Sequence, residues 1–160
     1  MNTIHLMVGI QGSGKSTFSK KISDELNIII ASTDEVRKQN KGVDEQQIWP
    51  LAYKMCVDEL KKGKDVIFDA TSITPKVRAR LINNIKEMFS SFEVGCYFFD
   101  VDPKICKSRV AERNKVEGEL YLPLEVIDSY NEKLIKPTLE EGFKFIKVIN
   151  HLGIIIEIIE

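Results

Sequence analysis

The sequence predicts an α/β fold in which a parallel sheet is covered by helices on both faces. Short apolar runs alternate along the chain with longer stretches of helical pattern, which is typical of successive βαβ units. A glycine-rich segment directly follows the first apolar run and precedes a helical stretch, which indicates a strand, a loop and a helix. The 160 residues match the size of one ordinary domain, so we expect a single domain over residues 1–160.

The expected strands are apolar runs at 4–8, 28–30, 66–68, 94–99 and 143–149. The expected helices have longer, mixed patterns and lie at 15–26, 46–62, 75–89, 103–113 and 123–140. Pro50 falls within the stretch 46–62. We expect Ile48 and Trp49 to lead into the helix and Pro50 to occupy its first helical position. The isoleucine-rich tail is expected to form a strand or hairpin over about 143–160, with docking on a partner subunit as the alternative.

Composition and charge exclude several classes of protein. Hydrophobic residues make up 43% of the chain and charged residues 29%, which is a globular balance. The net charge is −1, so no global field attracts a polyanion. No apolar run approaches the roughly 18 residues of a membrane span, and the N-terminus lacks the basic start of a signal peptide, so we expect a cytoplasmic protein without a membrane partner. The three cysteines show no CxxC spacing, which predicts buried, reduced thiols.

A phosphate-binding loop is the most specific motif. Residues 9–16 read Gly-Ile-Gln-Gly-Ser-Gly-Lys-Ser and fit the pattern GxxxxGK[ST], between an expected strand and an expected helix. Glycines let successive backbone N–H groups and the helix N-terminus surround a triphosphate, with Lys15 reaching its outer phosphates and Ser16 holding magnesium. The residues expected to bind the nucleotide are Gly9, Gln11, Gly12, Ser13, Gly14, Lys15, Ser16 and Thr17. The predicted cofactors are therefore ATP and Mg²⁺.

The guanine-binding class is unsupported by the rest of the chain. No DxxG motif occurs, and residues 114–117 read Asn-Lys-Val-Glu, with glutamate where a guanine-reading motif needs aspartate. A small phosphotransferase fits the length and the late arginines better than a motor or a switch.

A candidate acceptor site follows the second expected strand. Ser32 and Glu35 have the spacing of a capping box that opens a helix. Asp34 and Arg37 lie three positions apart and share one face of that helix. In an open parallel sheet this face meets the phosphate loop at the carboxyl ends of the strands. Asp34 is then placed to accept a hydroxyl proton as the acceptor oxygen attacks a phosphorus atom.

Asp69 ends the third expected strand, as an acid does in a Walker B segment. It has three possible roles, which the sequence leaves open: it supports magnesium, it orients Arg37 through a carboxylate–guanidinium pair, or it caps the turn before Pro75.

Arginine is scarce, and its five positions, 37, 78, 80, 109 and 113, all fall in segments that resemble sites. Arg109 and Arg113 lie four positions apart on one expected helix, which predicts a helical lid over about 103–122 whose arginines stabilise charge on a transferring phosphoryl group. The alternative is a solvated helix face with an ion pair from Arg113 to Glu117.

Together, these motifs resemble the 5′-kinase domain of phage-type polynucleotide kinases, within the zeta-toxin and polynucleotide-kinase-like group. The resemblance rests on residues 9–17, 32–37 and 68–71, followed by Pro75, Arg78, Arg109 and Arg113, in that order and spacing. It covers about residues 3–149 and includes the stretch from Leu122 to Tyr130. It implies a three-layer α/β/α P-loop NTPase fold of the nucleoside-monophosphate-kinase type, with a parallel sheet and a helical lid.

The resemblance also implies roles for the site residues. Lys15 and Ser16 would bind ATP and magnesium, and Arg113 with Arg109 would be the lid arginines. Asp34 would be the general base for a 5′-hydroxyl.

On the acceptor side, the resemblance implies that Arg37 contacts a phosphate of the acceptor and that Asp69, Thr71 and Arg78 support substrate binding. Lys38 and Lys76 would complete a small basic funnel with Arg37 and Arg78.

The predicted function is an ATP- and magnesium-dependent kinase that phosphorylates the 5′-hydroxyl of RNA or DNA ends. The first alternative is a P-loop kinase of a small hydroxyl metabolite, a nucleoside or a tRNA-linked hydroxyl. The second is a non-catalytic ATP-binding module that reports nucleotide state to a partner. The sequence leaves the oligomeric state open.

Overall fold

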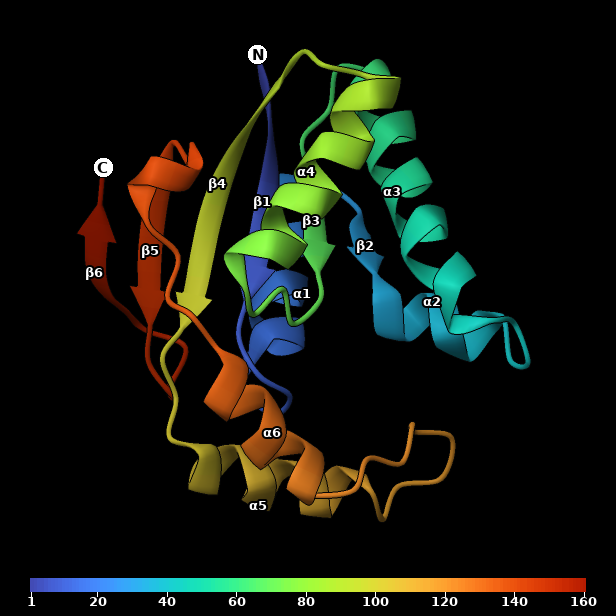
Figure 1. The fold of residues 1–160 in the computed structure, drawn as a ribbon, viewed down its shortest axis with the longest axis vertical. Helices are drawn as coiled ribbons and strands as arrows, with labels where there is room; N and C mark the ends of the chain where they lie inside the picture. The colour runs from blue at the N-terminus through green and yellow to red at the C-terminus, as the bar shows by residue number, and fades with distance from the viewer.

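The computed structural model describes residues 1–160 and contains one six-stranded sheet with the strand order β2-β3-β1-β4-β5-β6 (Figure 1). The strands are β1 (Asn2–Val8), β2 (Ile30–Ser32), β3 (Val66–Asp69), β4 (Phe92–Phe99), β5 (Phe145–Ile149) and β6 (Ile155–Ile159). The helices are α1 (Lys15–Leu26), α2 (Thr33–Gln39), α3 (Glu45–Lys61), α4 (Pro75–Met88), α5 (Pro103–Arg113), α6 (Glu125–Lys133) and the short 3₁₀ helix η1 (Leu139–Glu141). The first five strands in sequence pair in parallel, and β6 pairs with β5 in antiparallel.

Two hydrophobic cores lie on opposite faces of the sheet, which confirms the three-layer α/β/α prediction. The core on one face includes side chains from α3 and α4, such as Ala52 and Leu81. The core on the other face includes side chains from α1, α5 and α6, such as Phe18, Val110 and Ile127. Strand β1 lies between β3 and β4 and is buried on both faces, which explains its nearly continuous apolar sequence.

Local capping signals explain where several helices begin. The Ser32 hydroxyl accepts from the backbone N–H of Glu35 at the start of α2, and Thr74 and Asp102 cap α4 and α5 in the same way. Pro75 and Pro103 occupy the first turns of their helices, where a missing N–H costs no hydrogen bond. The starts of α4 and α5 coincide with the expected positions 75 and 103.

Two expected helix boundaries are wrong. Pro50 lies inside α3 as its sixth residue, because Asp44 caps a helix that begins at Glu45, and the proline ring is exposed. The expected helix 123–140 ends at Lys133, where the chain becomes extended and the N–H of Ile135 donates to the carbonyl of Ile73. Pro137 favours this extended conformation, because helical geometry is disfavoured for the residue that precedes a proline.

The C-terminal tail forms the expected intramolecular hairpin, in which β6 adds an antiparallel edge to β5. The three cysteines are free and buried, as the sequence predicts. None of the helices combines the length and the apolar character that a membrane crossing requires.

Candidate active site

A cavity of about 840 Å³ lies at the carboxyl ends of the parallel strands, where open α/β sheets bind ligands. Figure 1 shows α5 and α6 lying beyond these strand ends. The loop between β1 and α1 forms one end of the cavity, and α2 with the start of α3 contributes the other. Residues 120–122 and the turn at 151–153 complete its walls. The phosphate loop and the segment with Asp34 and Arg37, both predicted from the sequence, therefore line the same cavity.

The phosphate loop has a backbone that only glycine fits at its centre. Gly12 has a φ of 79°, and a Cβ there would lie 2.5 Å from the carbonyl oxygen of Cys106 in α5. The N–H of Gly9 donates to the carbonyl of Thr71, at 3.0 Å, which ties the loop to the segment after β3. The loop is therefore held against α5 on one side and against the end of β3 on the other.

Buried polar atoms in this loop lack protein partners. The Gln11 Oε1 and Ser13 Oγ atoms are buried without a hydrogen bond, which is rare in folded proteins and indicates a ligand-binding role. The Lys15 ammonium is also buried and donates to the carbonyl of Ile10 at 3.1 Å. Burial lowers the pKa of Lys15 from its ordinary value, and the nearby carboxylates of Asp69 and Asp34 partly oppose this shift. A buried cation beside unpaired polar atoms fits the phosphates of a nucleotide.

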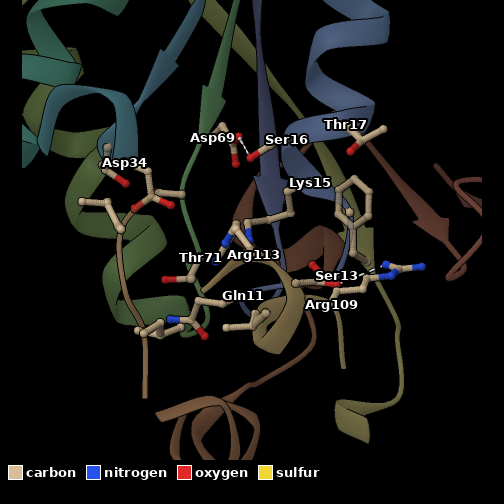
Figure 2. Close-up of a pocket in the computed structure, with 18 of the residues that line it drawn as sticks. Gln11, Ser13, Lys15, Ser16, Thr17, Asp34, Asp69, Thr71, Arg109 and Arg113 are labelled. Carbon is tan, nitrogen blue, oxygen red and sulfur yellow. Dashed lines mark hydrogen bonds between the residues drawn. The ribbon is translucent and has the colours of Figure 1, made fainter. Parts of the chain in front are cut away.

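Ser16 and Asp69 meet where the loop faces the end of β3. The Ser16 hydroxyl donates to Asp69 Oδ2 at 3.0 Å, shown as the dashed line in Figure 2. Burial raises the pKa of Asp69 above its ordinary value, while Lys15 and the Ser16 hydrogen bond act in the opposite direction. Two hard oxygen donors beside a phosphate site fit magnesium, which is usually held by one or two protein oxygens together with phosphates and water.

The contacts of Asp69 bear on the three roles that the sequence left open. Its contact is with Ser16, and the partners of Arg37 are Asp34 and Glu45, so Asp69 does not orient Arg37. The turn before Pro75 is capped by Thr74. The Ser16 contact of Asp69 is compatible with the magnesium-supporting role, and Thr71 and Thr17 line the same cavity.

The acceptor end is built from α2 and the first residue of α3. The Arg37 Nη1 atom donates to Asp34 Oδ1 at 2.7 Å, and its Nε atom donates to Glu45 Oε1 at 3.0 Å. Asp34 and Glu45 are exposed to the cavity, whereas Arg37 is half-buried between them. Asp34 and Arg37 therefore lie together on the cavity wall, as their spacing predicted.

Both predicted lid arginines line the cavity from α5. Arg109 donates to the carbonyl of Gly12 at 3.1 Å and also to the carbonyl of His151. Figure 2 shows Arg113 beside Lys15, and its charge contributes to the lowered pKa of that lysine. The alternative ion pair between Arg113 and Glu117 does not form. The predicted convergence of these arginines on the phosphate end is thus present in the fold.

Arg78 was wrongly predicted to bind substrate. It is completely buried, donates to both carboxylate oxygens of Glu141 at 2.8 and 3.0 Å, and donates to the carbonyl of Ser72 at 2.9 Å. It does not line the cavity, and neither does the exposed Lys76. The physical reason is that the Arg78 side chain is enclosed between the β3–α4 loop and η1. Its guanidinium bonds to Ser72 in that loop and to Glu141 in η1. The predicted basic funnel is therefore absent.

Residues 4–137 match the model of a family described as an AAA domain. The chain belongs to this family. A search of curated proteins finds no match for this AAA domain.

Solved structures share the fold of this AAA domain at low sequence identity. Kti12 from Chaetomium thermophilum in complex with ADP-AlF3 has a TM-score of 0.72 and 13% identity, and the alignment covers 92% of this chain and 88% of that chain. A sugar kinase from Janibacter sp. HTCC2649 has a TM-score of 0.64, 17% identity, and coverage of 95% and 86%. A gluconokinase from Sinorhizobium meliloti 1021 has a TM-score of 0.59, 16% identity, and coverage of 93% and 82%. These likenesses confirm the P-loop fold and do not single out a polynucleotide kinase.

Several cavity residues of the AAA domain were missed from the sequence. Glu45, Trp49 and Tyr121 line the cavity, together with the turn at 151–153. None belongs to a spaced motif, so no local signal distinguishes them from ordinary surface or core residues. Trp49 is the single tryptophan of the chain, which is the one feature that sets it apart.

Proposed function

We propose that this AAA domain is an ATP- and magnesium-dependent kinase that transfers a γ-phosphoryl group to the hydroxyl of a small molecule. The observation that carries the proposal is the meeting of Lys15 and Asp34 in one cavity, from separate elements. Their charges are near enough for Asp34 to raise the pKa of Lys15. A phosphate-binding cation and a carboxylate across one cavity are what phosphoryl transfer to an alcohol requires.

At the phosphate end, the chain binds and positions the nucleotide. The loop glycines leave room for the phosphates, and Lys15, Arg113 and Arg109 provide positive charge from two directions. Ser16 and Asp69 would hold magnesium, which supplies further positive charge to the oxygens of the transferring group. Most of the rate enhancement would come from this positioning and charge stabilisation.

At the acceptor end, Asp34 acts as the general base. The acceptor O–H proton passes to a carboxylate oxygen of Asp34 while the acceptor oxygen forms its bond to the γ-phosphorus. The bond from that phosphorus to the bridging oxygen breaks, and ADP leaves with the electron pair. Arg37 holds Asp34 Oδ1, so the second carboxylate oxygen is free to take the proton.

A small acceptor is supported over a nucleic-acid end. The cavity lacks the basic funnel that a phosphodiester backbone would contact, because Arg78 and Lys76 lie outside it. The shared fold with a sugar kinase and a gluconokinase agrees with a small hydroxyl acceptor. The order of the motifs along the chain favours a second candidate, the polynucleotide 5′-hydroxyl kinase, which the same assay tests.

The decisive assay is transfer of labelled γ-phosphate from ATP with magnesium. Acceptors are pooled sugars, polyols and nucleosides, beside 5′-hydroxyl RNA and DNA oligonucleotides with 5′-phosphorylated controls, and Asp34→Ala is the blank. Label on small hydroxyl compounds is the expected result. Label on 5′-hydroxyl strands alone would show that the acceptor is a nucleic-acid end, and the proposed kinase activity would stand. ATP binding without any transfer would favour a nucleotide-sensing module.

A further inference from the structure

The geometry of the acceptor end assigns a specificity role to Glu45: it occupies the guanidinium of Arg37 and thereby excludes acceptors that carry a negative charge near the reacting hydroxyl. This inference rests on the proposed kinase function and narrows its substrate class to uncharged hydroxyl compounds. Glu45 is the first residue of α3, whereas Arg37 comes from α2, so the contact exists only after the two helices pack.

The contact between Glu45 and Arg37 is bidentate. Arg37 Nε lies 3.0 Å from Glu45 Oε1 and 3.1 Å from Oε2, and Arg37 Nη2 donates to Oε1 as well. An arginine binds a phosphate or carboxylate group of a ligand with the same bidentate geometry. Glu45 therefore takes the place that an anionic acceptor would need. Hydrogen bonding by Glu45 is also the largest influence that raises the pKa of Arg37.

The charge at this end of the cavity is negative. One guanidinium, that of Arg37, faces the carboxylates of both Asp34 and Glu45. Both carboxylates are more than half exposed, with side-chain exposures of 55% and 64%, so an entering ligand meets them directly. An anion would find the positive charge already compensated and would be repelled by the remaining negative charge.

No other cation is available on the acceptor side. Lys38 is paired with Glu35 at 3.4 Å and with Glu119 at 3.1 Å. The remaining cations of the cavity wall come from α1 and α5, on the side of the phosphate loop, where ATP would meet them. An acceptor phosphate or carboxylate would therefore lack a counter-charge.

The uncharged side chains among these charged groups suit a hydroxyl compound. Trp49 and Tyr121 line the cavity and add aromatic surface, while Thr33 and Thr71 add hydroxyl groups. The combination of carboxylates and aromatic rings binds neutral hydroxyl groups by accepting their hydrogen bonds. An uncharged polyol or sugar is the acceptor class that these residues fit.

The test measures anion binding without turnover. Sulfate is titrated by calorimetry into wild type, Glu45→Gln and Asp44→Asn, each saturated with magnesium and a non-hydrolysable ATP analogue to fill the phosphate loop. Trp49 fluorescence reports whether the sulfate binds at the acceptor end. Asp44→Asn is the matched control, because it removes one negative charge at the neighbouring position, which caps α3 and does not touch Arg37.

We expect Glu45→Gln to bind sulfate about tenfold more tightly than wild type, since it releases a charged hydrogen-bond donor. Asp44→Asn should match wild type, and adding Arg37→Gln to Glu45→Gln should abolish the gain. Equal sulfate binding, or none, in wild type and Glu45→Gln would overturn the inference. Because the titration needs no reaction, its failure is distinct from a failure of the proposed kinase activity.

A turnover assay then addresses the acceptor class. Glycerol and glycerol 3-phosphate are compared as acceptors or competitors in wild type and Glu45→Gln. The expected result is that Glu45→Gln shifts the preference toward the phosphorylated compound, mainly through KM. A wild type that prefers glycerol 3-phosphate would contradict the role of Glu45.

Discussion

The phosphate end and the acceptor end of the cavity are constructed differently. The phosphate end is one continuous loop with the first turn of α1, and its key groups, Lys15, Ser13 and the neighbouring Asp69, are buried. The acceptor end joins α2, α3 and residues 120–122, and its ion pairs are exposed. The difference teaches that the phosphate-binding groups come mainly from one local motif, whereas the residues proposed to act on the acceptor meet only in the folded chain.

This difference has an energetic side. Exposed ion pairs such as the one between Arg37 and Asp34 contribute only about 0–1 kcal/mol to stability. Buried polar groups such as Lys15 and Asp69 depend on one precise surrounding. The exposed charged residues of the acceptor end are therefore expected to tolerate substitution better than the buried polar groups of the phosphate end.

The largest expected effect on activity is at the acceptor end. Asp34→Ala should lower kcat by about 10²–10⁴-fold, because the general base is lost, with nearly unchanged ATP affinity. Label transfer and ATP binding measured on the same preparation would check this. Wild-type turnover in the variant would remove Asp34 from the mechanism.

Arg78 provides the contrasting case of an arginine that supports the fold. Arg78→Ala should lower the free energy of unfolding by about 3–5 kcal/mol, because it leaves the Glu141 carboxylate without its partner. The exposed Arg80, two positions later, is the matched control, and its replacement by alanine should change stability by at most about 0.5 kcal/mol. Denaturant unfolding measures both. A raised KM for the acceptor, with unchanged stability, in Arg78→Ala would restore the prediction that Arg78 binds substrate.

A comparison of Gly12 in the phosphate loop with Gly63 in the turn after α3 separates the cost of backbone strain from the cost of close packing. Both have positive φ angles, of 79° and 77°, so alanine at either costs about 1–2 kcal/mol. Only at Gly12 does a Cβ meet another group, the Cys106 carbonyl at 2.5 Å, while nothing lies within 4 Å at Gly63. Gly12→Ala should therefore be the more destabilising variant and should also weaken nucleotide binding. Equal losses of stability would show that α5 moves freely away from the loop.

The smallest expected effect concerns the contact between Lys38 and Glu119, which joins α2 to the segment after α5. Glu119→Gln should change the free energy of unfolding by less than about 1 kcal/mol, because the pair is exposed to solvent. Thermal unfolding at low and high salt would measure it. A larger loss would mean that the acceptor end is as tightly determined as the phosphate end.

Most strands and helices could be predicted because their signals are local. The Ser32, Thr74 and Asp102 caps act within three residues, and the apolar runs of the central strands reflect burial on both faces. Pro50 misled the prediction because a proline disfavours a helix interior, yet Ile48 and Ala52 on either side of it pack α3 into the hydrophobic core. The helix expected over 123–140 failed because a backbone contact with Ile73, far away in sequence, ends it.

The sequence by itself determined the α/β class, the phosphate loop and the carboxylate on α2, since each depends on residues close together in the chain. Only the tertiary structure decided that Arg78 is buried against Glu141, that Asp69 meets Ser16, and that Glu45 occupies Arg37. Each of these contacts joins side chains from different elements. Their geometry arises when the helices pack on the sheet, because a residue's own position in the sequence does not specify which distant charge it will meet.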